Sequence, residues 1–515
     1  MGLPVIPACV LVFTGELNKY KMYSLDLKEF LKLSKKSNVI PIYKEINADL
    51  DTPVSAFLKI KMSDYAFLLE SVEGQEKLAR YSFMGVSPSL IFKSKGGEIE
   101  IDYVQEKRRQ RFTTALSPLD EVKKIMRQFK CARIKGLARF CGGMVGFIGY
   151  DMVRFFEDIP DRNEDELGLE DTILMLMDTI LVFDHVKHTI KIVSNAIIPG
   201  EGLLSLPAKE KIYRDCLRKI ERIFARLSLS YKEKKASRSP AASKPSSNFT
   251  KGEFKKIVSC AREYIKNGDI IQVVLSQRFK IRTSRDPFAI YRTLRSLNPS
   301  PYMYFLKFKD LTIVGASPEM LIRCEDGLIQ TRPIAGTRPR GRDKAEDARL
   351  ANELIKDKKE RAEHLMLVDL GRNDLGRVCK IGTVSLSEFM NIEKYSHVMH
   401  LVSEVKGILD NRRYDIYDVL KAAFPAGTVS GSPKVAAMKI IDELENTRRG
   451  PYAGCVGYFS FLHNLDTCIT IRTVLIKGDK ASVQAGAGIV ADSIPDKEYV
   501  ETVNKARALI EAITN

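Results

Sequence analysis

The sequence predicts a mixed α and β fold. Strand-like runs alternate with helical patterns along the whole chain of 515 residues. The composition, with 44% hydrophobic and 29% charged residues, is typical of globular proteins and excludes a mainly disordered chain. No apolar run reaches the roughly 18 residues that a membrane span needs, which excludes an integral membrane protein. A chain of this length has room for about two to four domains.

The N-terminal part of the chain is expected to contain short strands and a few helices. Residues 1–21 should be peripheral to the fold, because a second methionine, Met22, opens the first segment with helical spacing. A helix is expected to start after Ser24, which is predicted to be its N-cap. The run 171–184 is typical of one or two buried strands, and 206–227 has helical spacing.

A polar segment divides the chain. Residues 231–249 are rich in Lys, Ser, Ala and Pro and should form a flexible basic linker. It would separate an N-terminal domain, 22–230, from a C-terminal domain, 250–515. In the second domain the patterns predict helices at 251–266, 343–370, 433–445 and 496–513, and strands at 271–281, 311–315, 468–477 and 481–485.

Charge and cysteine content narrow the class of protein. The net charge is +17, which leaves a basic nucleic-acid-binding protein as an alternative. No long basic helix or aromatic-interleaved basic patch supports that alternative. The nine cysteines stand singly, without a Cys-x-x-Cys pair. This argues against a disulfide framework and a zinc ribbon, and favours a reducing, cytoplasmic location.

Three segments match known motifs only superficially. The segment 486–491 fits G-x-G-x-x-A, but no helix opens directly after it, so its glycines are interpreted as points of close backbone approach. The segment 427–434 lacks the spacing of a phosphate loop. Ser432 is predicted to cap a helix that Pro433 opens, and the free N–H groups there would either meet an anion or simply be capped. Cys455 has no partner base, so an intrinsic amidotransferase is rejected.

Two pairs of glutamates are the strongest candidates for a binding site. Glu360 and Glu363 are three residues apart in one predicted helix, so they share a helix face. Glu498 and Glu501 have the same spacing in the last helix. The pairs either lie on solvated faces or bind one Mg²⁺ together, an ion that takes one or two carboxylates and leaves its other sites to water and an anionic substrate.

Two single residues also have alternative roles. Arg472 lies in a strand-like run, from which its guanidinium would either clamp a carboxylate or form a surface ion pair. His400 lies in an apolar run, where a histidine is more often a hydrogen-bonded core residue than a catalytic base.

The order of several longer motifs indicates a family. They are 333–337, 363–378, 427–434, 468–472 and 484–488, together with the two glutamate pairs. In this combination the sequence resembles the chorismate-utilising enzymes over residues 22–510, and within them anthranilate synthase component I. The resemblance implies an α+β fold of two intertwined domains, in which two central β-sheets pack face to face and helices lie outside.

The resemblance also implies a reaction. Ammonia adds to chorismate to give aminodeoxyisochorismate, and elimination of pyruvate then gives anthranilate, at the first step of tryptophan biosynthesis. Mg²⁺ would be bound by Glu363 and Glu501, with Glu360 and Glu498 supporting it through water. Glu319 corresponds to the general acid that protonates the leaving hydroxyl, a role that needs a raised pKa.

The other matching positions bind substrate or complete the reaction. Arg472 and Tyr452 correspond to groups that bind the enolpyruvyl carboxylate. His400 and Thr428 correspond to residues of the elimination step. Backbone contacts to the substrate correspond to Gly336, Thr337, Gly486, Ala487 and Gly488.

Two positions discriminate within the family. Relatives that make 4-amino-4-deoxychorismate carry a lysine nucleophile where this chain has Ala335. Relatives that make isochorismate or salicylate carry a lysine base where this chain has Gln272, and glutamine cannot deprotonate water. The implied nucleophile is therefore an amine. An aminodeoxyisochorismate synthase that stops before pyruvate elimination remains the alternative, and His400 argues against it.

Regulation and a partner are implied as well. The elements that bind L-tryptophan in feedback-inhibited relatives correspond to Glu70, Ser71, Pro301, Tyr302, Met303 and Cys468. The alternative is that these segments are merely a strand and a turn of the core. Use of glutamine would need a separate glutamine amidotransferase subunit, anthranilate synthase component II, in a heterodimer or heterotetramer.

Overall fold

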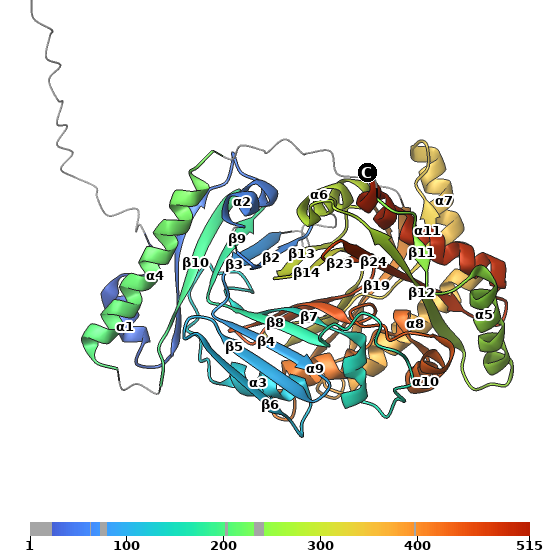
Figure 1. Cartoon of the computed structure of the whole chain (residues 1–515), viewed down its shortest axis with the longest axis horizontal. Coiled ribbons are helices and arrows are strands. Elements are labelled where there is room, and N and C mark those ends of the chain that lie inside the picture. Colours follow the sequence, from blue (N-terminus) through green and yellow to red (C-terminus); the bar gives the residue numbers. More distant parts are fainter. Residues whose placement is uncertain (1–22, 62, 73–79, 201–203, 231–241, 396–397) are drawn as a thin grey trace, which may run out of the picture.

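The strands of this computed structural model form two large antiparallel sheets (Figure 1). The structure describes residues 23–61, 63–72, 80–200, 204–230, 242–395 and 398–515. The predicted peripheral extension, 1–21, therefore lies outside the described residues. Within the described ranges each sheet has 12 strands.

The strand order shows how the chain is distributed over the two sheets. The first sheet runs β1 (Val39–Asn47), β10 (Thr189–Ile197), β9 (Thr179–Asp184), β3 (Tyr81–Val86), β2 (Tyr65–Glu70), β13 (Tyr302–Phe308), β14 (Leu311–Ser317), β23 (Thr473–Lys477), β24 (Lys480–Ile489), β12 (Gln272–Arg282) and β11 (Ser246–Ser247), with β20 (Gly431–Ser432) beside β12. The second runs β17 (Ile334–Pro339), β19 (Val398–Ile408), β16 (Leu328–Thr331), β15 (Met320–Glu325), β22 (Leu465–Ile469), β21 (Cys455–Ser460), β7 (Gly143–Ile148), β8 (Thr172–Met177), β4 (Leu90–Lys95), β5 (Glu98–Tyr103) and β6 (Arg108–Thr113), with β18 (Ser385–Lys394) beside β19.

Both sheets contain strands from both halves of the chain. In the first sheet β2 pairs with β13, and in the second β7 pairs with β21. Each sheet is therefore continuous only when both halves contribute to it. The intertwined arrangement that the family resemblance implied is confirmed.

A buried aromatic layer lies between the sheets. Phe147 of β7 packs edge-on against Phe308 of β13, with ring centroids 5.7 Å apart. Phe83 of β3 contacts Tyr458 of β21 at 5.8 Å. Because each pair joins one sheet to the other, the sheets pack face to face, as predicted.

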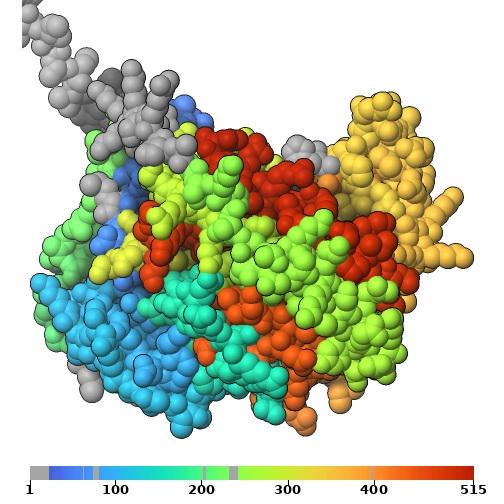
Figure 2. Space-filling view, turned by 45° about the vertical axis from the view of Figure 1, so that its right-hand side comes forward, coloured from blue at the N-terminus to red at the C-terminus, as the bar shows by residue number. Residues whose placement is uncertain are grey.

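Helices cover the outer faces of the sheets (Figure 1). Apolar side chains of α1 (Leu27–Leu33), α2 (Pro53–Ile60), α4 (Leu206–Leu227), α6 (Pro287–Leu297) and α11 (Pro495–Thr514) join the core on the first sheet. Those of α3 (Pro118–Arg127), α8 (Lys358–Gly376), α9 (Ile416–Ala423) and the 3₁₀ turns η1 (Tyr150–Phe155) and η2 (Gly427–Val429) join the core on the second. The helices α5 (Lys251–Lys266) and α10 (Lys434–Leu444) pack together beside β12, and α7 (Lys344–Lys356) projects from the body in yellow in Figure 2.

Two predicted N-caps are wrong. The first helix is capped by Asp26, whose Oδ1 accepts from Glu29 N at 2.9 Å in a capping box, while Ser24 Oγ accepts from Tyr43 N at 2.9 Å. Ser432 does not cap α10, because it belongs to β20 and pairs with Gln272. Neither serine caps a helix, because Ser24 bonds to β1 and Ser432 pairs with β12.

The predicted single helix over 343–370 is two helices. Asp357 ends α7 and is the N-cap of α8, where its carboxylate accepts from the N–H groups of Lys359 and Glu360. A short acidic side chain that bonds backbone N–H groups competes with helix continuation. The break places Glu360 and Glu363 in the first two turns of α8.

The described end of the predicted linker is attached to the first sheet. Ser246 and Ser247 form β11, and Ser247 Oγ donates to Gln277 Oε1 at 2.7 Å. Phe249 is buried next to α5. This attachment fixes where α5 starts.

Two sequence-based exclusions can be compared with the described residues. Within those ranges, the structure contains no helix with the length and apolar character that crossing a membrane requires. The eight cysteines in the same ranges are all free thiols.

Candidate active site

Arg472 lies where the chain crosses from one sheet to the other. The predicted strand over 468–477 is two strands, because β22 ends at Ile469 in the second sheet and β23 begins at Thr473 in the first. Arg472 has a left-handed backbone (φ 51°) in this crossover, so it does not project from a regular strand as predicted. Strand periodicity cannot reveal that two consecutive strands belong to different sheets.

The Arg472 guanidinium is available to bind an anion. It lines a cavity of about 620 Å³ together with Glu501 and Lys505. Among the described residues no side chain or carbonyl forms a hydrogen bond or ion pair with it. Burial lowers the pKa of Arg472, and the nearby Tyr452 and Glu501 oppose this shift. A half-buried cation without a protein partner favours binding of a carboxylate or phosphate.

The two glutamate pairs meet beside this cavity. Burial raises the pKa of Glu363, and the carboxylates of Glu360 and Glu501 raise it further. Burial also raises the pKa of Glu498, again with a contribution from Glu501. The pairs from α8 and α11 are therefore close enough to repel each other. No three Asp, Glu, His or Cys side chains in the described ranges already converge as a metal-ligand set.

Lys505 is a site residue that the sequence reasoning missed. Its Nζ donates to the Gly486 carbonyl at 3.0 Å and forms an ion pair with Glu501 Oε1 at 2.7 Å. The available signal was helical spacing, since position 505 is one turn after Glu501 in the last predicted helix. Lys505 joins α11 to β24 and places a second cation in the Arg472 cavity.

His400 is held in one tautomer by the strand that precedes the glutamates. Its Nδ1 lies 2.9 Å from the Gly336 carbonyl, so Nδ1 donates and Nε2 keeps its lone pair. Thr337 Oγ1 lies 3.1 Å from the same nitrogen. Burial lowers the pKa of His400, which keeps the ring neutral. A Cβ at Gly336 would lie 3.1 Å from Glu360 Oε2, so this part of β17 adjoins the glutamates.

Glycines of β24 make room for two polar side chains. A Cβ at Gly486 would lie 2.7 Å from the Tyr452 hydroxyl, and a Cβ at Gly488 would lie 2.6 Å from Gln272 Nε2. Between them the Ala487 side chain lies in the apolar cluster under α5, so only its backbone can face the site. Burial raises the pKa of Tyr452 to about 12, which keeps its hydroxyl protonated. The close approaches predicted from the glycines are confirmed at these two positions.

Glu319 is a buried carboxyl with the properties of a general acid. Burial raises its pKa to about 8, and Thr428 and Lys505 only partly oppose the shift. Thr428 Oγ1 is itself buried and makes no hydrogen bond of ordinary geometry within the described residues. Ile469 N donates to the Glu319 carbonyl at 3.1 Å, which fixes the backbone of Glu319 to the Arg472 crossover.

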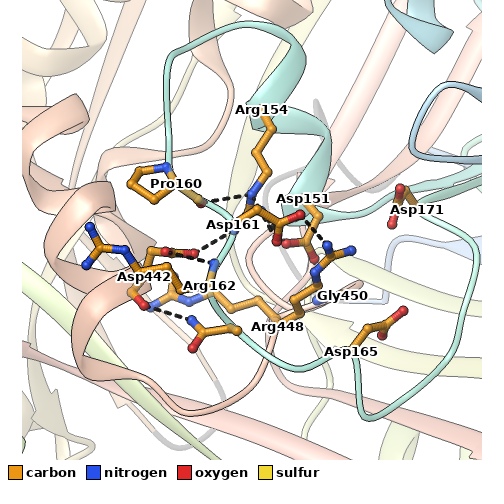
Figure 3. Close-up of polar contacts among 12 residues, drawn as sticks. Asp151, Arg154, Pro160, Asp161, Arg162, Asp165, Asp171, Asp442, Arg448 and Gly450 are labelled. Atoms are coloured by element: carbon orange, nitrogen blue, oxygen red, sulfur yellow. Dashed lines mark hydrogen bonds and ion pairs between the residues drawn. The ribbon is translucent and has the colours of Figure 1, made fainter.

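The turn that carries Tyr452 is held from outside by an ionic network (Figure 3). Asp151 Oδ2 accepts from Gly450 N at 2.9 Å. Arg154 bridges Asp151 and Asp442 at 2.5 and 2.7 Å, and Arg448 pairs with Asp161. A segment of the N-terminal half thereby positions a site residue of the C-terminal half.

A second cavity, of about 50 Å³, lies between the sheets. All six residues predicted for tryptophan binding line it, together with Tyr458 and Asp466. They are Glu70, Ser71, Pro301, Tyr302, Met303 and Cys468. The Glu70 carboxylate accepts from Tyr291 and pairs with Arg295 at 3.3 Å, while Ser71 Oγ is buried without a partner in the described residues.

Comparison with known proteins places this geometry in a family. Residues 64–511 match the family described as chorismate binding enzyme. The chain belongs to the chorismate binding enzymes, which confirms the resemblance predicted from its motifs.

Within this family, the chain is similar to proteins named anthranilate synthase component 1. Anthranilate synthase component 1 of Aquifex aeolicus is 50% identical over 493 residues, covering 95% of this chain and 98% of the relative. The protein of that name from Acetivibrio thermocellus is 47% identical over 496 residues, covering 96% and 99%. The crystal structure of anthranilate synthase component I from Streptococcus pneumoniae superposes with a TM-score of 0.74 at 37% identity, covering 90% and 98%. The menaquinone-specific isochorismate synthase of Escherichia coli shares the fold, with a TM-score of 0.69 at 19% identity.

Proposed function

We propose that this chain is the large component of an anthranilate synthase. It would aminate chorismate with ammonia and then eliminate pyruvate to give anthranilate. The observation that carries the proposal is the proximity of four glutamates from two helices, of which Glu501 lines one cavity together with the unpartnered Arg472. Relatives with 47% and 50% identity over nearly the whole chain bear that name.

Mg²⁺ fits the donor set of this glutamate cluster. Burial and neighbouring carboxylates raise the pKa of Glu363 and of Glu498, and the cluster supplies the oxygen ligands that this ion prefers, so a cation would relieve the repulsion. Glu363 and Glu501 would bind it directly, with Glu360 and Glu498 acting through water. When bound, the ion would neutralise a substrate carboxylate and stabilise charge as the hydroxyl departs.

The surrounding residues then have separate tasks in the proposed reaction. Arg472 and the protonated Tyr452 hydroxyl bind the enolpyruvyl carboxylate. Glu319 donates a proton to the leaving hydroxyl, which departs as water. Gln272 lies where ammonia approaches and cannot activate water as a base. His400 Nε2 accepts the ring proton that is lost during pyruvate elimination, and Thr428 takes part in the same step.

Product analysis distinguishes the proposed function from its alternative. The chain is incubated with chorismate, Mg²⁺ and an ammonium salt, and the products are separated by chromatography. Equal amounts of anthranilate and pyruvate are expected. Aminodeoxyisochorismate without pyruvate would instead assign the synthase that lacks the elimination step.

Gly486→Ala should weaken chorismate binding. The added Cβ would lie 2.7 Å from the Tyr452 hydroxyl and 3.0 Å from the Leu275 carbonyl, so Tyr452 must move. We expect KM for chorismate to rise by about tenfold, or about 1.4 kcal/mol. Gly252→Ala on α5 is the matched control, because its Cβ would meet no atom within 4 Å. An unchanged KM in Gly486→Ala would contradict the assignment of Tyr452.

A glutamine amidotransferase subunit is proposed as the partner. The relatives are named component 1, and this chain offers no nucleophile elbow at Cys455, a buried thiol whose pKa burial raises. We expect glutamine to replace ammonium only when anthranilate synthase component II is added. Light scattering of the mixture distinguishes a heterodimer from a heterotetramer.

L-tryptophan is proposed to bind the cavity between the sheets and to inhibit the enzyme. The two features that support this are the six predicted residues on its walls and the unpartnered Ser71 hydroxyl. Ser71→Ala should raise the inhibition constant for L-tryptophan at least about tenfold, the usual cost of a lost hydrogen bond to a charged ligand. The measurement is initial rate against tryptophan concentration, scaled to each variant's own uninhibited rate. Equal inhibition constants would place the inhibitor elsewhere.

A further inference from the structure

A buried ion pair lies behind the walls of the candidate active site. Arg449 and Glu445 are only 2% and 5% exposed. Arg449 Nε lies 3.0 Å from Glu445 Oε2, and Nη2 lies 2.6 Å from Oε1. The pair lines neither the Arg472 cavity nor the cavity between the sheets. It therefore acts on the site only through other residues.

Arg449 and Glu445 also form hydrogen bonds with the backbone of two other segments, η2 and β12. Arg449 Nη1 donates to the Val429 carbonyl and Nη2 to the Val274 carbonyl, each at 2.7 Å. Glu445 Oε1 accepts from both the N–H and the hydroxyl of Ser276 at 2.8 Å. The planar guanidinium fork thus joins η2 and β12 in one fixed geometry.

Each of these contacts lies next to a residue of the proposed reaction. Val429 follows Thr428, and Val274 is two residues after Gln272. The Arg449 guanidinium also lies 5.5 Å from the centre of the Tyr452 ring. A fourth connection runs to β24, because Ser276 Oγ accepts from Gln484 Nε2 at 2.8 Å, two residues before Gly486.

We propose that Arg449, together with Glu445, is a positioning residue that holds Tyr452, Thr428 and Gln272 in the relative geometry that amination and elimination require. This inference rests on the proposed function. A buried ion pair contributes little to the free energy of unfolding once desolvation is counted, so its contribution lies in fixing these segments relative to one another. Lysine in place of Arg449 would keep the charge but lose the fork that reaches both carbonyls and Glu445.

The test compares Arg449→Lys with Arg413→Lys. The control makes the same chemical change at an exposed arginine, whose side chain pairs with Asp410. Both variants and the wild-type chain are assayed with chorismate, Mg²⁺ and ammonium, well below their melting midpoints. The readouts are kcat/KM and the ratio of pyruvate to accumulated aminodeoxyisochorismate. Both products are measured as initial rates, so that a smaller folded fraction lowers both equally and leaves their ratio unchanged.

Arg449→Lys is expected to lower kcat/KM at least tenfold and to lower the pyruvate ratio at least threefold, because Thr428 and Tyr452 lose their common support. Arg413→Lys should stay within twofold of the wild-type chain in both readouts. An unchanged product ratio in Arg449→Lys would overturn the inference. If that variant does not fold, Glu445→Gln, which keeps an oxygen for Ser276, replaces it under the same criteria. A wild-type chain that forms neither product would instead refute the proposed function.

Discussion

Glu363→Gln is expected to abolish nearly all turnover while making the metal-free protein more stable to heat. In the proposed site this carboxylate binds Mg²⁺ directly, so the ion would lose one of its two protein ligands. We expect kcat/KM to fall by about a thousandfold, which corresponds to about 4 kcal/mol of transition-state stabilisation. Steady-state rates over a Mg²⁺ titration measure this loss.

The stability effect has the opposite sign for a separate reason. Burial and the neighbouring Glu360 and Glu501 raise the pKa of Glu363, so its charged form is disfavoured in the folded protein at neutral pH. Glutamine removes that charge, and the melting midpoint without Mg²⁺ should rise by a few degrees. The control is Asp369→Asn on the same helix, an exposed change that should alter neither property. A lowered melting midpoint in Glu363→Gln would contradict the claim that the carboxylates around Glu363 repel one another.

Glu319→Gln should lower kcat by about a hundred- to ten-thousandfold, because the leaving hydroxyl would lose its proton donor. In the wild-type chain the pKa of about 8 sets the pH dependence of this role. The carboxyl is protonated below that value, so kcat/KM should fall as the pH rises above it. Rates must be compared at a constant concentration of un-ionised ammonia, because that concentration also changes with pH.

The Glu319 carboxyl should also make the free energy of unfolding depend on pH, which provides an independent check of its raised pKa. Folding raises its pKa from the ordinary value of 4.5 to about 8, so the folded state holds the proton more tightly. The contribution of this group to the free energy of unfolding is therefore largest at low pH and is lost as the pH rises through about 8. Glu319→Gln should remove this pH-dependent loss. The melting midpoint of the variant minus that of the wild-type chain should therefore increase between about pH 6 and 9. If the difference between the two melting midpoints does not change with pH, the pKa of Glu319 is not raised by folding.

Much of the fold was predictable because its helices are amphipathic and its family motifs are long. The helix limits 206–227 and 251–266 were confirmed as α4 and α5. Glu498 and Glu501 lie in one helix, α11, as their spacing predicted. The sharing of both sheets by both halves came from the family resemblance, since pairings such as β2 with β13 join residues far apart in the sequence.

The parts that sequence reasoning missed depend on contacts between distant segments. Arg472 was expected on a regular strand, but the chain changes sheets there, and the local pattern of apolar residues is the same in either case. Lys505 acquires its role from the Gly486 carbonyl, 19 residues earlier. The His400 tautomer depends on Gly336, 64 residues away. Spacing within one element cannot predict such partners.

The most direct test of the central claim uses ¹⁵N-labelled ammonium. The purified chain, without a partner subunit, is incubated with chorismate and the labelled salt, with Mg²⁺ or with an excess of chelator, and anthranilate is analysed by mass spectrometry. The account predicts singly labelled anthranilate with an equal amount of pyruvate in the presence of Mg²⁺, and neither product with the chelator. Unlabelled or absent anthranilate, or turnover that survives the chelator, would contradict it.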